Sequence, residues 1–190
     1  MLYERLNRRP SRERPERQAQ WEAARQEVEQ LVDRLGTPVD QGIRDSVVAL
    51  RLLGLKTSMS CEGHLHAGMQ APWIDFNPQV SKEIREREER ALAERNHDQL
   101  NRLRREVNAL VAKEWHKLLP LLDEFYRNRI VAYDRRLVLT CTGETTRLMS
   151  QGGEIQYGAD EEIARGRLRA YRLEMDAFTR FLREKFLTGS

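Results

Sequence analysis

Residues 60–66 contain the densest group of chemically reactive side chains in this sequence. They read Ser-Cys-Glu-Gly-His-Leu-His, so a thiol, a carboxylate and two imidazoles lie within seven residues. Such groups bind metals, transfer protons or act as nucleophiles. Gly63, in the middle of the run, has the backbone freedom that a tight turn requires. The run therefore indicates a functional site.

One interpretation of the run is a metal site. Cys61, His64 and His66 supply up to three ligands, and Cys141 is a candidate for a fourth. Thiolate and imidazole ligands together favour zinc among the common ions, so zinc is the candidate cofactor under this interpretation. No C-x2-C pair, the usual mark of a structural zinc site, occurs in the sequence. Three protein ligands with an open position are typical of catalytic rather than structural zinc.

Two other interpretations remain open. In the first, Cys61 is a nucleophile or redox thiol, and His64 is the base that lowers the pKa of that thiol. Glu62 is then a candidate general acid or base, so the predicted catalytic residues are Cys61, Glu62 and His64. In the second, the run is structural. The thiol is then a small buried side chain, Gly63 serves a turn, and His64 bonds a carbonyl group.

The sequence around the run resembles a group of small uncharacterised bacterial and phage proteins. In those proteins an amphipathic helix leads into a strand ending in S-C-x-G-H, and a short apolar strand follows. The matching residues here are T-S-M-S-C-E-G-H at 57–64 and P-W-I-D-F at 72–76. The turn is also similar to the S-S-C-x-G-R segment of the tRNA wybutosine-synthesising methyltransferase family, from which this chain departs with His64 in place of arginine.

The resemblance covers residues 40–76 and implies that four residues of the run act as a unit. These residues are Ser60, Cys61, Gly63 and His64. It implies no particular activity. Substrate is predicted to contact Ser60 and Gly63 in the run and Trp73 beside it, where the indole would form a neighbouring wall.

Extended segments and helices are predicted to position this run. Residues 55–59 and 72–76 read as short strands, so the connection at 61–71 is longer than a hairpin turn and is a candidate working loop. Asp40 is a good N-cap for a helix that ends near Gly54. An earlier helix is predicted from apolar residues at spacings of three and four, which are Trp21, Ala24, Val28, Leu31 and Leu35.

The second half of the chain reads as a long helical segment, three strands and a final helix. Residues 81–125 begin with a dense mixed-charge run, and a break at 96–98 would turn them into a helical hairpin. Pro120 is predicted to kink or restart this segment. The predicted strands are residues 129–133, 137–142 and 145–149. Asp160 is predicted to cap the last helix.

This order of elements predicts an α+β fold. Helices do not alternate with every strand, which argues against a doubly wound parallel sheet. We expect a small antiparallel or mixed sheet of four to five strands with packed helices and a long charged helix or helical hairpin that extends outward. The predicted organisation is a flexible Arg-rich arm at 1–14 and a single domain at 15–190 with a helical insertion at 81–125.

Composition limits the function classes only loosely. The 33 basic and 30 acidic residues nearly cancel to a net charge of +3, which permits a nucleic-acid partner without indicating one. No stretch approaches the ~20 apolar residues of a membrane helix, and the N-terminus lacks an apolar secretory segment. A cytoplasmic location without a membrane partner is therefore expected.

Two functions are compatible with these features. The first is a Cys/His loop site, with or without a metal ion, that acts on a nucleotide or nucleic acid. The alternative is a non-enzymatic binding or assembly protein that uses the charged helix at 81–119 as its interaction surface, with a homo-oligomer formed through the helices as one outcome.

Overall fold

The computed structural model describes residues 13–33, 36–77, 80–142, 145–154 and 160–189. Most of the predicted N-terminal arm, residues 1–12, lies outside the described residues. Its last two predicted residues belong instead to helix α1 (Glu13–Glu29). Among the described residues, no helix combines the length and apolar character needed to cross a bilayer.

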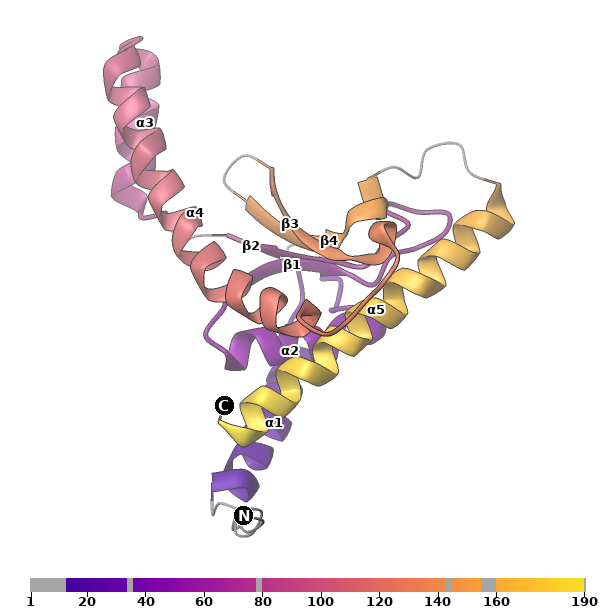
Figure 1. Cartoon of the computed structure of the whole chain (residues 1–190). Coiled ribbons are helices and arrows are strands. Elements are labelled where there is room, and N and C mark those ends of the chain that lie inside the picture. The colour runs from indigo at the N-terminus through magenta and orange to yellow at the C-terminus, as the bar shows by residue number, and fades with distance from the viewer. Residues whose placement is uncertain (1–12, 34–35, 78–79, 143–144, 155–159, 190) are drawn as a thin grey trace, which may run out of the picture.

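A four-stranded antiparallel sheet forms the centre of the molecule (Figure 1). Its strands are β1 (Thr57–Cys61), β2 (Trp73–Phe76), β3 (Leu137–Thr142) and β4 (Thr145–Ser150). They lie in the order β1-β2-β4-β3, so β1 and β3 are the two edges. The predicted α+β class is confirmed.

Helices cover one face of this sheet. Figure 1 shows α2 (Arg44–Leu52) and the long α5 (Glu161–Thr188) packed beneath the strands. The apolar residues of β2 and β4 that point to this face, Ile74, Phe76 and Leu148, are fully buried. Burial of such side chains stabilises the fold by about 1.5–3 kcal/mol each. The core continues into the apolar stripe of α5, which is Leu168, Tyr171, Met175, Phe178 and Leu182.

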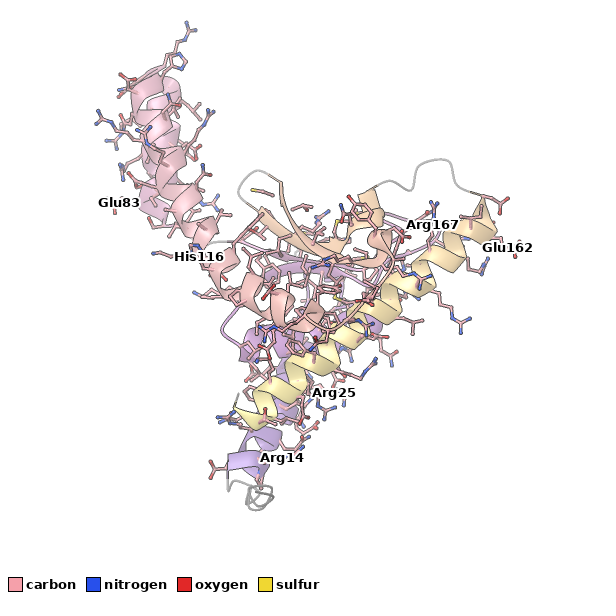
Figure 2. All side chains as sticks on the ribbon, in the orientation of Figure 1. Arg14, Arg25, Glu83, His116, Glu162 and Arg167 are labelled. Carbon is pink, nitrogen blue, oxygen red and sulfur yellow. The ribbon has the colours of Figure 1, made fainter. Side chains whose placement is uncertain are left out.

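The predicted helical segment after the second strand is a hairpin. Its helices are α3 (Lys82–Ala93) and α4 (His97–Tyr126), and Asn96 caps α4 by accepting a hydrogen bond from the Gln99 amide at 3.1 Å. The outer half has its own small core of Ala91, Leu100 and Leu103. It projects away from the sheet (Figure 1), and charged side chains surround it (Figure 2). The helix continues through Pro120, so the predicted restart there is wrong.

Two sequence predictions about strands need correction. The first strand occupies 57–61 rather than 55–59, so Cys61, the first residue of the predicted loop, ends the strand instead. Residues 129–133 form no strand, and the side chain of Ile130 is fully exposed. Side chains hold this segment instead. Arg129 forms a bidentate ion pair with buried Glu174 of α5, at 3.1 and 2.7 Å.

Candidate metal centre

The reactive run lies at the end of edge strand β1 and the start of the loop that follows. Cys61 is the register partner of Trp73 on β2, so their side chains are neighbours on one face of the sheet. Ser60 precedes Cys61 in the strand, and its side chain therefore points to the opposite face. Trp73 therefore lies on the same face of the sheet as the Cys61 thiol. Ser60, the other predicted substrate contact in a strand, does not.

Three side chains converge at this strand end. The ligand atoms of Asp40, Cys61 and His64 all lie within 4.8 Å of one another. His64 Nε2 and Asp40 Oδ2 are 3.3 Å apart. All three side chains are partly exposed, so small solutes can reach them. The cluster combines a thiol, an imidazole and a carboxylate, each of which is a common zinc ligand.

The predicted ligand set needs two changes. His66 is not part of the cluster, because its side chain is 74% exposed and its Nε2 lies 3.9 Å from Glu161 on α5. Cys141 is on β3, at the edge of the sheet opposite to β1, three strand spacings or roughly 14 Å away. The geometry therefore excludes Cys141 as a ligand and puts Asp40 in the place of His66.

The sequence predicted a different role for Asp40, that of a helix N-cap. It lies at the N-cap position before the 3-10 turn Gln41–Ile43, but its side chain makes no capping hydrogen bond. The carboxylate instead accepts the Glu62 amide at 3.0 Å and contacts His64. Its Oδ2 atom therefore connects the start of α2 with the loop that carries the reactive run.

A second missed residue, Arg172 of α5, clamps the turn. Its guanidinium donates to the carbonyl oxygens of Glu62 and Gly63 at 3.0 and 2.6 Å. It also pairs with the Glu62 carboxylate at 3.2 Å. The other oxygen of Glu62 accepts the Gly42 amide at 2.7 Å. Both oxygens of Glu62 are thus engaged in holding the loop, and its role as a proton carrier stays a prediction.

The remainder of the loop is fixed by its own backbone and by the sheet below it. The His64 amide donates to the Met69 carbonyl at 3.0 Å. Arg147 of β4 contacts the Met69 sulfur at 3.1 Å and forms a bidentate ion pair with Asp75 of β2, at 2.7 and 2.8 Å. The same guanidinium lies 4.0 Å from the centre of the Trp73 ring. These contacts hold the loop in a defined position above the sheet.

The electrostatics of the cluster oppose a reactive thiolate. Burial raises the pKa of the Cys61 thiol above its ordinary value of 9.0, and the Asp40 and Glu62 carboxylates raise it further. The Gly63 amide, 3.3 Å from the sulfur, acts in the opposite direction but is outweighed. The thiol is therefore protonated at neutral pH, which disfavours a nucleophile activated by His64. A bound metal ion would displace this proton.

The raised thiol pKa leads to a testable prediction in a Cys141→Ser background. Because only the thiolate reacts, alkylation of Cys61 is expected to be slow at pH 8 and to accelerate through pH 9 without a plateau. Asp40→Asn removes a negative charge that raises this pKa, so it should speed the reaction severalfold at pH 8. Timed mass spectrometry with iodoacetamide in the presence of EDTA measures both rates. Equal rates for the two proteins would contradict the role of Asp40.

A groove lined by arginines adjoins the cluster. It has a volume of about 390 Å³, and we call it the arginine groove. His64 and Leu65 form one wall. The opposite wall belongs to α5, where the groove is lined by Arg165, Leu168, Arg169, Arg172 and Leu173. The three arginines are spaced by four and three residues, which places them on one helical face. This spacing could have predicted the arginine face from the sequence, but arginine is so abundant in the chain that the pattern does not stand out.

Comparison with known proteins finds no relative for this arrangement. No family model matches the chain, no curated protein matches it, and no solved structure matches it. Function must therefore be argued from the site itself.

Proposed function

We propose that this protein is a zinc-dependent hydrolase that acts on a nucleotide or nucleic acid. Asp40, Cys61 and His64 hold the metal, and the arginine groove holds a phosphate of the substrate. One observation carries the proposal: His64 belongs both to the ligand cluster and to the wall of the groove. A phosphate bound to the arginines would thus lie beside the metal.

The donor set supports zinc. Tetrahedral zinc with bonds of about 2.0–2.3 Å separates its ligand atoms by roughly 3.3–3.8 Å. The imidazole and carboxylate atoms already have this spacing at 3.3 Å, and all three ligand atoms lie within 4.8 Å, so a small contraction completes the site. Three ligands leave one position for water, whose pKa zinc lowers to about 7.

The groove supports a phosphorylated substrate. Guanidinium groups match phosphate oxygens with paired hydrogen bonds. The α5 wall of the groove carries three arginines. In hydrolysis of a phosphate ester, the oxygen of water bonds to phosphorus, and the ester oxygen leaves and takes up a proton. A cytoplasmic location, where cysteine thiols stay reduced, suits Cys61 as a ligand.

Metal content tests the ligand assignment directly. Protein purified without an affinity tag or chelator is expected to contain near-stoichiometric zinc, as is the His66→Ala variant. His64→Ala and Asp40→Asn should each lose most of this zinc, and hydrolysis of nucleotide substrates should be lost with it. Inductively coupled plasma mass spectrometry gives the stoichiometry. Zinc-free wild-type protein after zinc loading, or equal loss in His66→Ala and His64→Ala, would overturn the proposal.

A second candidate function rests on the projecting hairpin of α3 and α4. Its outer half has a separate core and charged surfaces, which suits a binding or assembly role with the loop as a structural element. Charge reversal along residues 82–95 should then weaken a partner or oligomer contact. Unchanged mass and partner profile after that reversal would remove this candidate.

A further inference from the structure

The arginine-lined face of α5 continues beyond the metal cluster into a second groove. This groove has a volume of about 440 Å³ and lies between α5 and residues 129–135. Arg169 and Leu173 line both grooves, so the two grooves adjoin along this face of α5, and together we call them the track. Arg165 and Arg172 are seven residues apart, which corresponds to about 10 Å along the helix. The track is thus longer than the site of a single phosphate.

The charges along the track favour an anion with several phosphates. Five arginines line the two grooves, namely Arg129, Arg135, Arg165, Arg169 and Arg172, against one carboxylate, Glu174. Three of these arginines pair with carboxylates: Arg129 with Glu174, Arg165 with Glu161 and Arg172 with Glu62. Arg135 and Arg169 make no side-chain ion pair with any residue that the structure describes.

Apolar side chains alternate with these arginines. Ile130 is fully exposed and Leu173 is 58% exposed, and both line the second groove. Exposed aliphatic groups next to guanidinium groups, which themselves stack on π faces, suit the faces of unpaired bases. A duplex hides its base faces in the stack and offers only phosphates and groove edges, so it cannot use these side chains.

We propose that the track binds single-stranded nucleic acid. Its phosphates lie against Arg169 and Arg135, and its bases lie against Ile130 and Leu173. At about 3.4 Å per stacked nucleotide, the helical part of the track alone accommodates roughly three nucleotides. The strand then continues along α5 to His64. This last step rests on the proposed function and makes the substrate of the metal centre a polynucleotide rather than a mononucleotide.

Binding of a fluorescein-labelled twelve-residue oligothymidylate tests the track without involving the metal. The measurement is fluorescence anisotropy at several salt concentrations in the presence of EDTA. The double variant Arg135→Gln/Arg169→Gln is expected to bind at least tenfold more weakly. It should also reduce the slope of log K against log salt by about 1.4, because each phosphate contact on a single strand contributes about 0.7.

Arg167→Gln is the matched control. Arg167 lies on the same part of α5 (Figure 2) but lines neither groove, and it should bind oligothymidylate like the wild type. Because binding is measured in EDTA, the track can stand even if the metal proposal fails. Equal losses in Arg167→Gln and the double variant would overturn the track. So would equally tight binding of thymidine monophosphate, of a twelve-base-pair duplex, or of heparin, a polyanion without bases.

Discussion

Gly63→Ala is expected to lower the free energy of unfolding by about 3 kcal/mol and to abolish metal binding. Gly63 has a φ of +78°, a conformation that costs other residues about 1–3 kcal/mol. A Cβ atom there would also lie 2.6 Å from the carbonyl carbon of Ala71 and 2.9 Å from its oxygen. Since these are backbone atoms, the loop itself must move. Overpacking of this kind costs a further amount of about 1–3 kcal/mol.

Gly68→Ala in the same loop separates backbone strain from the steric clash. Gly68 also has a positive φ, of +69°, but no atom lies within 4 Å of an added Cβ. This variant should therefore lose only about 1 kcal/mol and keep its metal. Urea denaturation gives both free energies, and zinc analysis gives both metal contents. Similar losses of stability in the two variants would show that the close approach of Gly63 to Ala71 does not control the loop.

Arg147→Met is expected to lower the free energy of unfolding by about 3–5 kcal/mol. Asp75, on central strand β2, has a side chain only 7% exposed, and Arg147 is its only ion-pair partner among the described residues. Removal of the guanidinium leaves a buried carboxylate without a counter-charge, which is the costly way to break such a pair. The contacts of Arg147 with Met69 and Trp73 are lost as well, so the loop above the sheet should become less ordered.

A double variant and a surface pair complete this test. Asp75→Leu/Arg147→Met replaces both charges with apolar groups and should recover most of the lost stability, because no unpaired charge remains. Arg87→Met breaks an equally bidentate pair with Glu106, at 3.1 and 3.1 Å, on the exposed hairpin. It should cost at most about 1 kcal/mol. A cost for Arg147→Met no larger than that of Arg87→Met would contradict the assigned role of the buried pair.

Local sequence patterns predicted most of the secondary structure. The apolar stripe of α5 repeats at spacings of three and four and is buried, and Asp160 caps the helix as predicted by accepting the Glu162 amide at 2.8 Å. The hairpin of β3 and β4 was also predicted correctly, whereas the sequence left open whether the charged segment forms one long helix or the helical hairpin that the structure has. The segment at 129–133 was predicted wrongly. Its β-branched residues suit a strand, but the segment pairs with neither edge strand, and the Arg129–Glu174 pair holds it on α5 instead.

The location of the reactive groups could be read from the chain, because the Cys61–His64 spacing and Gly63 are local features of one turn. The groups that complete the site depend on long-range packing. Asp40 lies 22 residues before Glu62, and Arg172 lies 109 residues after Gly63. Such partners depend on how α2 and α5 pack against the sheet, which no local spacing encodes. The choice of His64 over His66 has the same origin. The turn at Gly63 and the bond to Met69 direct the first imidazole toward Asp40, while the second lies beside Glu161 of α5.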